Sequence, residues 1–124
     1  MPNIQRDTLR GHLASLVLAV LERGPAHGLE VIRRLEAAGH GSLLLKEGTL
    51  YPALYRMEAA GLVEAEWEDA TPSRKGAISP GASRRGPRRR IYRLTTKGKR
   101  QLARGREEFV QFVQVIGGIL GATP

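Results

Sequence analysis

The chain has 124 residues, of which 41% are hydrophobic, and this size and composition suit one modest globular domain. It contains no cysteine, which excludes disulfides, thiolate metal sites and cysteine nucleophiles and is typical of proteins in a reducing compartment. The first nine residues carry charges without an apolar core, and no apolar stretch reaches the length of a membrane span. We therefore expect a cytoplasmic protein with no signal peptide and no membrane partner.

The net charge of +8 is concentrated in the second half of the chain. Residues 70–106 contain thirteen lysines and arginines and no aspartate or glutamate, and they directly follow the acidic stretch 64–69. Such a basic block attracts a polyanion, because binding releases the counterions condensed on nucleic acid. A solubilising surface or a mobile basic loop would have the same composition. Charge alone therefore points to nucleic acid without selecting it.

Apolar periodicity predicts three helices in the first half of the chain. Apolar residues recur at helical spacing over residues 4–23, directly before Gly24 and Pro25, which end a helix. A second helix is expected over residues 28–38, and a third over residues 46–60. The lengths of the second and third helices suit a helix-turn-helix.

The third predicted helix contains a proline in its first half. Leu50, Leu54 and Met57 share one face of this helix, which leaves the polar and small residues on the other faces. Pro52 disfavours helical angles in the residue before it, which would place the helix start at the proline. A proline in the first turns costs little, because the earliest N–H groups lack intrahelical partners. We therefore place the helix start near Lys46.

Two alternating segments after this helix predict a β-hairpin. Residues 62–67 and 90–94 alternate between apolar and polar positions, as strands do. Residues 69–89 between them are rich in proline, glycine, serine and arginine and show no apolar periodicity. The sequence therefore predicts a two-stranded hairpin with a basic tip that does not order itself when free.

A long helix is predicted from Thr95 or Thr96, both of which are good N-cap residues, to about residue 119. Its apolar stripe is formed by Leu102, Phe109, Phe112, Val113, Ile116 and Ile119. Burial of one such side chain contributes about 1.5 to 3 kcal/mol, so a stripe with nothing to cover it favours association. We expect this helix to form the interface of a homodimer.

The predicted order of helix, helix, helix, basic hairpin and helix defines a mostly α fold, a winged helix-turn-helix. The expected division is a DNA-binding domain at residues 1–95, with a wing loop at about 69–89, and a C-terminal dimerisation helix at residues 96–124. Local strings in this order resemble those of the PadR family. They are the apolar helix 13–21, AHGLEVI at 26–32, EGTLYPAL at 47–54, RME at 56–58, GLV at 61–63, and RIYRLT at 90–95 followed by Gly98.

The resemblance covers about residues 13–98 and implies a transcriptional regulator, usually a repressor. In this family a homodimer places two recognition helices in successive major grooves of double-stranded DNA and two wings along the flanking backbone. The single helix after Gly98 is similar to the shorter branch of the family. The wing loop is longer and richer in arginine than is usual there. Some short members line a drug pocket with a tryptophan in the last helix, whereas the one tryptophan here is Trp67.

Candidate DNA contacts come from the third helix and the wing. The N-terminal turns of a recognition helix enter the major groove, where hydroxyl groups reach phosphates and an arginine reaches phosphate or guanine. The predicted contacts are Lys46, Thr49, Tyr51, Tyr55, Arg56, Arg88, Arg89 and Arg90. Tyr51 could instead pack against the hairpin and expose only its hydroxyl group. Strand alternation allows only one or two of the three wing arginines to face DNA together.

Other function classes find less support in the sequence. Phosphate-binding loops and nucleophile signatures are absent, so an enzyme is not expected. The three histidines lack ligand-like spacing, and we expect no metal and no cofactor. The alternatives are a nonspecific nucleic-acid-binding or RNA-binding module acting through the basic hairpin, and an interaction dimer that no longer binds DNA. We expect the repressor to be released by a small-molecule or other signal, and a small-molecule effector would bind between the last helix of one subunit and the first helix of the other, near Phe109, Phe112 and Trp67.

Overall fold

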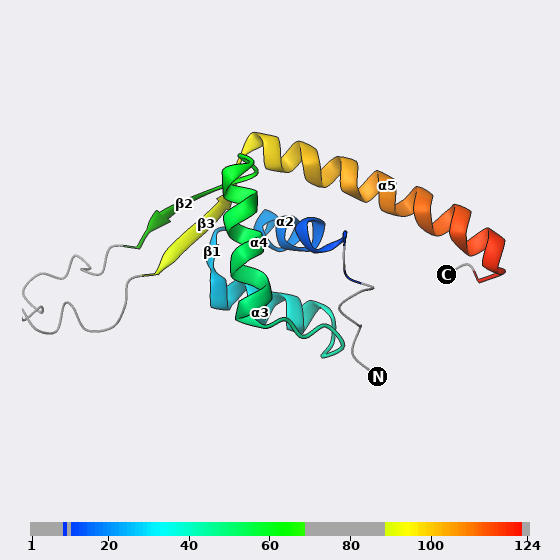
Figure 1. Cartoon of the computed structure of the whole chain (residues 1–124), viewed down its shortest axis with the longest axis horizontal. Helices are drawn as coiled ribbons and strands as arrows, with labels where there is room; N and C mark the ends of the chain where they lie inside the picture. Colours follow the sequence, from blue (N-terminus) through cyan, green and yellow to red (C-terminus); the bar gives the residue numbers. More distant parts are fainter. Residues whose placement is uncertain (1–8, 10, 69–88, 123–124) are drawn as a thin grey trace, which may run out of the picture.

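The computed structural model of the chain describes Leu9, residues 11–68 and residues 89–122. The elements in chain order are α2 (Leu13–Glu22), β1 (Ala26–His27), α3 (Gly28–Ala38), α4 (Glu47–Ala59), β2 (Val63–Trp67), β3 (Arg90–Leu94) and α5 (Thr96–Leu120). Helices α2, α3 and α4 pack together, and the β2–β3 hairpin projects from them to one side (Figure 1). Helix α5 crosses near α2 and extends away in the opposite direction (Figure 1).

The core lies where α2, α3 and α4 meet the sheet and the first turns of α5. Its fully buried side chains are Val17, Leu18, Val31, Leu50, Leu54 and Val63, together with Leu102. The apolar face predicted for the third helix is confirmed, since Leu50, Leu54 and Met57 are all buried. The placement of Leu102 in a dimer interface is wrong, because this side chain is only 2% exposed within one chain. It lies near the start of α5, where the chain's own core covers it.

The first predicted helix is shorter than expected. Gly11 has a φ of +90°, which interrupts the predicted continuous helix over residues 4–23, and α2 begins at Leu13. Residues 4–8 and residue 10 of that prediction lie outside the described residues. At the other end of α2, the Arg34 guanidinium group from α3 donates hydrogen bonds to the carbonyls of Val20 (3.3 Å) and Gly24 (3.0 Å). These bonds attach α3 to the end of α2 and to the residue after its C-cap, and the Val20 carbonyl also accepts a hydrogen bond from the Arg23 N–H (3.2 Å).

Helix α4 begins at Glu47, one residue after Lys46, which is its N-cap. Pro52 lies inside the helix, as predicted. The carbonyl that lacks a donor because of this proline belongs to Gly48, and both residues are exposed. The missing hydrogen bond therefore lies on the solvent side of the helix.

The sheet has three antiparallel strands in the order β1-β3-β2, where two strands were predicted. The predicted hairpin is confirmed, with Val63 opposite Leu94 at one end and Trp67 opposite Arg90 at the other. The strand missing from the prediction is β1, whose two residues Ala26 and His27 pair with β3. A two-residue strand is too short for alternation to show in a sequence. The predicted wing loop lies outside the described residues, apart from Arg89.

The first turn of α5 is fixed to the turn that ends α4. Thr95 is the N-cap, and its side-chain oxygen accepts a hydrogen bond from the Gly98 N–H (3.0 Å) and lies 2.6 Å from the Gly61 carbonyl oxygen. Lys97 Nζ donates a hydrogen bond to the Ala60 carbonyl (2.8 Å). Gly98 packs against the carbonyl of Leu62 so closely that a Cβ atom would overlap it. We call these two segments, residues 60–62 and 95–98, the α4–α5 joint.

Helix α5 also packs against α2, and Arg106 donates a hydrogen bond to the Glu22 carboxylate of α2 in an ion pair (2.8 Å). Three packed helices, a wing and a C-terminal helix together form the predicted winged helix-turn-helix. Among the described residues, no helix combines the length and the hydropathy needed to cross a lipid bilayer.

Candidate nucleic-acid interface

The solvent side of α4 is a surface of small residues from which one tyrosine projects. Tyr55 is 74% exposed. Helical geometry places Gly48, Pro52 and Ala59 on the same face, opposite the buried leucines, and all three are exposed. We call these four residues the outer face of α4. Because its other members are small, a bound molecule can approach the helix backbone closely.

Tyr51 lies on one flank of this face and packs against the start of α3. A Cβ atom on Gly28 would come within 2.5 Å of the Tyr51 ring, so the glycine makes room for the tyrosine. The ring therefore contacts α3, whereas the alternative from the sequence was a contact with the hairpin, and 39% of Tyr51 stays exposed. Burial, with a smaller contribution from the Glu47 carboxylate, raises the pKa of Tyr51 above its ordinary value. The hydroxyl group is protonated at neutral pH, as in any tyrosine, and can donate a hydrogen bond.

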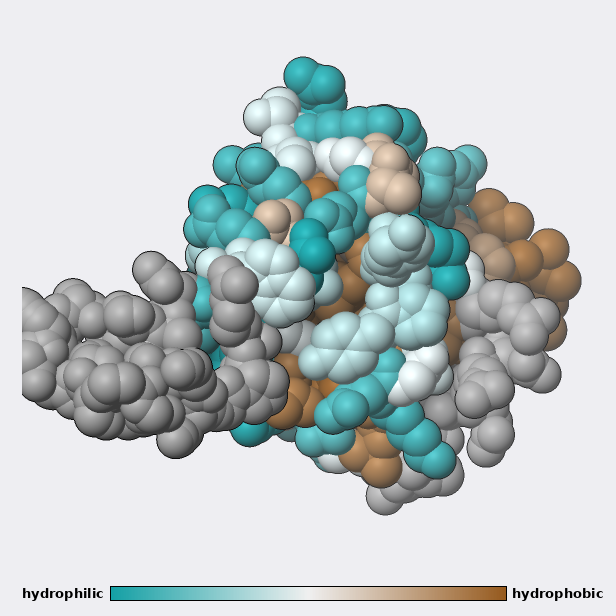
Figure 2. All heavy atoms as spheres, turned by 60° about the vertical axis from the view of Figure 1, so that its left-hand side comes forward, coloured by the Kyte–Doolittle hydropathy of each residue, from teal (hydrophilic) through white to brown (hydrophobic). Residues whose placement is uncertain are grey.

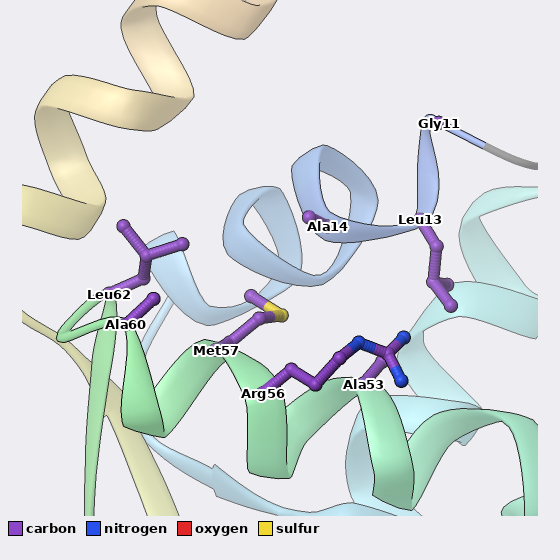
Figure 3. Close-up of a pocket in the computed structure, with 8 residues that line it drawn as sticks. All are labelled: Gly11, Leu13, Ala14, Ala53, Arg56, Met57, Ala60 and Leu62. Atoms are coloured by element: carbon purple, nitrogen blue, oxygen red, sulfur yellow. The ribbon is translucent and has the colours of Figure 1, made fainter.

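Arg56 lies on the opposite flank of α4, away from Tyr51. Figure 3 shows its side chain in a groove between α4 and the start of α2. The groove has a volume of about 340 Å³, and its other lining residues are Gly11, Leu13, Ala14, Ala53, Met57, Ala60 and Leu62. Of the remaining predicted contacts on this helix, Lys46 is exposed at the N-cap and Thr49 is half-buried. The structure therefore divides the predicted α4 contacts between two flanks and the outer face.

The wing arginines differ in what they contact. Arg88 lies outside the described residues. Arg89 is exposed beside β3, with one guanidinium nitrogen 3.2 Å from His27 Nε2 and another 3.9 Å from the Glu68 carboxylate. Arg90 turns toward α4, where its Nη2 donates a 2.8 Å hydrogen bond to the carboxylate of Glu58. Of the two predicted contacts Arg89 and Arg90, Arg89 is the one left exposed to solvent.

Part of the basic block is neutralised by acidic residues from elsewhere in the chain. Besides the Arg90–Glu58 pair, Arg93 pairs with Glu66 (3.0 Å), and Arg106 with Glu22. The positive charge available to a polyanion is therefore smaller than the charge counted along the sequence.

The second half of α5 exposes a broad apolar surface. Large apolar side chains with more than a third of their area exposed are Phe109, Val110, Phe112, Val115, Ile116, Ile119 and Leu120. Val113, also predicted in the dimer interface, is half-buried. Phe109 and Phe112 also make edge contacts with the His12 ring at the start of α2, with centroid distances of 6.0 and 6.3 Å. Figure 2 shows hydrophobic surface gathered at the end of the molecule away from the wing, whereas the surface turned toward the viewer is mainly polar.

Sequence reasoning missed three features of this interface. Val110, Val115 and Leu120 broaden the apolar surface of α5 beyond the predicted stripe, and helical spacing alone could have included them. Glu58 as the partner of Arg90 had no local signal, because the two residues are 32 positions apart. Trp67 lies in the wing, while Phe109 and Phe112 lie in the part of α5 at the other end of the molecule (Figure 1). One chain therefore does not bring these three aromatic residues together.

A helix-turn-helix whose third helix presents an exposed face beside a β-wing defines a winged-helix DNA-binding regulator. Residues 17–78 match the Transcriptional regulator PadR-like family, and since this is half of the chain, the protein belongs to that family. Nowhere in the described ranges do histidine, aspartate and glutamate side chains gather into a group of three that could hold a metal ion.

Solved structures show the same fold over nearly the whole chain. A PadR-family transcriptional regulator from Eggerthella lenta is 30% identical, with a TM-score of 0.69 and coverage of 92% of this chain and 86% of that one. A PadR-family transcription regulator from Clostridium difficile is 28% identical, with a TM-score of 0.69 and coverage of 89% and 99%. A transcriptional regulator from Clostridium thermocellum is 24% identical and shares the fold with a TM-score of 0.74, covering 93% and 96%.

Proposed function

We propose that the protein is a homodimeric repressor that reads a specific DNA sequence and is released by a small-molecule signal. The observation that carries the proposal is the outer face of α4, from which Tyr55 projects beside the wing of a PadR-like winged helix. The outer face enters the major groove, and the small neighbours of Tyr55 allow the helix to approach the base edges.

Contacts to the DNA backbone come from both flanks of α4 and from the wing. Tyr51 offers a protonated hydroxyl group, and Lys46 and Arg89 offer exposed positive charges. Arg56 contributes from the edge of its groove. Such contacts fix the register of a protein on the duplex, and they make its affinity depend on salt.

Dimerisation through α5 supplies the second recognition helix. Seven large apolar side chains are exposed on this helix, and Ile119 alone is 76% exposed. Each contributes about 1.5 to 3 kcal/mol when fully buried, so the set provides a strong drive to associate. The proposed effector binds in apolar space between α5 of one subunit and the start of α2 of the other, beside Phe109 and Phe112.

Sequence recognition is tested by measuring the affinity of the protein for two duplexes at two salt concentrations. One duplex is the intergenic DNA upstream of the protein's own gene, and the other is a scrambled sequence. We expect a preference of about a hundredfold or more that survives the higher salt. The variant Tyr55→Ala should lower this preference, whereas Arg33→Met, an exposed change on α3, should leave it unchanged. Equal binding to both duplexes that collapses with salt would instead identify a nonspecific nucleic-acid-binding protein.

The dimer is tested by sedimentation equilibrium. Ile119→Glu places a charge in the exposed apolar surface and should shift the wild-type dimer toward monomer. Gln101→Glu adds the same charge on α5 outside that surface and serves as the control. A wild-type protein that is monomeric at micromolar concentration would refute the dimer. Repression is tested with a reporter gene under the bound promoter, whose expression should rise when the regulator is deleted.

A further inference from the structure

Arg90 sits in a three-residue cluster at the tip end of the described hairpin. Its Nη2 donates a 2.8 Å hydrogen bond to Glu58 of α4, and its guanidinium carbon lies 5.3 Å from the centroid of the Trp67 ring. Trp67 is the cross-strand partner of Arg90. One arginine thereby connects both strands of the wing to the recognition helix.

This geometry leaves little of the Arg90 guanidinium group available to DNA. Its Nε is buried and makes no hydrogen bond within the described ranges, Nη2 is bound to Glu58, and the cation faces the Trp67 ring. The side chains of Arg90 and Glu58 are 34% and 30% exposed, so the pair is partly shielded from solvent. To reach a phosphate, the guanidinium group would have to leave a carboxylate and an aromatic ring.

The connection lies at the tip end of the described hairpin, beyond Tyr92 of β3, which is buried in the core shared with α4. At its opposite end, the hairpin follows α4 directly through the α4–α5 joint. Along its β3 edge, the hairpin is held by β1, which leads into α3. The Arg90–Glu58 pair therefore fixes the angle between the wing and the recognition helix near the tip.

We propose that Arg90 and Glu58 are positioning residues for sequence recognition. They hold the wing at the angle at which it and the outer face of α4 engage one duplex together. The inference rests on the proposed DNA-reading function. It assigns Arg90 a role different from the direct DNA contact expected from the sequence, and it gives the acidic Glu58 a role in binding a polyanion.

The direction in which Glu58→Gln changes the DNA affinity distinguishes this positioning role from a purely electrostatic effect. Removal of a negative charge strengthens binding to any duplex if only charge matters. Under the proposal, Glu58→Gln weakens binding to a duplex selected by the wild-type protein from a random library, by about tenfold, and does not weaken binding to a scrambled duplex. Arg90→Gln should lower the affinity for the selected duplex by a similar factor.

Salt dependence separates positioning from a phosphate contact. Loss of one phosphate contact reduces the slope of log affinity against log salt by about one and weakens all duplexes about equally. Arg90→Gln should keep the wild-type slope and lose affinity mainly for the selected duplex. The double variant Glu58→Gln/Arg90→Gln should be no weaker than either single variant, because both remove the same interaction.

Matched controls come from the neighbouring ion pair of the wing. Arg93 and Glu66 form a 3.0 Å pair between β3 and β2 that does not involve α4, so Arg93→Gln and Glu66→Gln should leave the preference for the selected duplex within about twofold. All measurements are made below the melting temperature of each variant, and Arg90→Lys provides a conservative second variant with intermediate loss. A wild-type protein without any preference refutes the proposed function itself. Equal weakening on both duplexes with a smaller slope, or tighter binding by Glu58→Gln to both, overturns the positioning role alone.

Discussion

Gly98→Ala tests whether the α4–α5 joint depends on close backbone contact. The new Cβ would overlap the carbonyl oxygen of Leu62 and come within 3.1 Å of a Leu94 methyl carbon. That carbonyl oxygen also lies 3.2 Å from the Thr95 nitrogen and 3.0 Å from the Thr95 hydroxyl oxygen. The single Thr95 hydroxyl proton also faces the Gly61 carbonyl oxygen at 2.6 Å, so displacement of the Leu62 carbonyl costs mainly the backbone hydrogen bond, about 1 kcal/mol. Overpacking adds about 1 to 3 kcal/mol.

Alanine is the better helix former by about 1 kcal/mol, which leaves a net loss of about 1 to 3 kcal/mol for Gly98→Ala. The assay is urea unfolding at one fixed protein concentration. Gly48→Ala is the matched control, because its Cβ meets no other atom within 4 Å, and it should be as stable as the wild type or more stable. A Gly98→Ala protein as stable as the wild type would refute the close contact. An equal loss in both variants would show that the contact is not the cause.

Three further predictions follow from described contacts. Arg34→Met should lose about 1 to 2 kcal/mol of unfolding free energy because it removes the hydrogen bonds to the end of α2, while the exposed Arg33→Met should lose almost none in the same urea assay. The hydrogen bond and charge of Arg106 lower the pKa of Glu22 below 4.5, so the pair stabilises the fold above pH 4.5 and this contribution is lost as the pH falls through the lowered pKa. The difference in urea midpoint between the wild type and Glu22→Gln should therefore shrink below pH 4.5, and a constant difference would contradict the assignment. Gly48→Ala should weaken DNA binding in fluorescence anisotropy without loss of stability, since it adds a methyl group to the outer face.

Helical periodicity was sufficient for most of the fold. Helix α3 has the predicted bounds, and α4 and the two hairpin strands differ from theirs by one residue at most. The same spacing indicated that Tyr55 is exposed. Periodicity could not show which part of the α5 stripe the chain itself covers. Leu102 and Phe109 belong to the same stripe. Leu102 is buried because it packs into the core, whereas Phe109 lies further along α5 and stays half exposed.

Charge counted along the sequence was less informative than charge in space. Arg90, Arg93 and Arg106 belong to a block without any acidic residue, yet their carboxylate partners lie 32, 27 and 84 positions away. A count of charges along the sequence does not include ion pairs that form only when the strands and helices pack together. The same limit hid β1, whose partner strand follows more than sixty residues later.

The α4–α5 joint couples the direction of α5 to the orientation of α4. Helix α5 has 25 residues, which corresponds to a length of about 37 Å. A change of about 5° in its direction at the joint moves its far end by about 3 Å relative to α4. Apart from the Lys97 hydrogen bond, the joint is built from backbone carbonyls, an N-cap hydroxyl group and a glycine contact, so it has few flexible side chains that could absorb such a change. A displacement of the far end of α5 by a few ångströms is thus carried to α4 as a change of orientation.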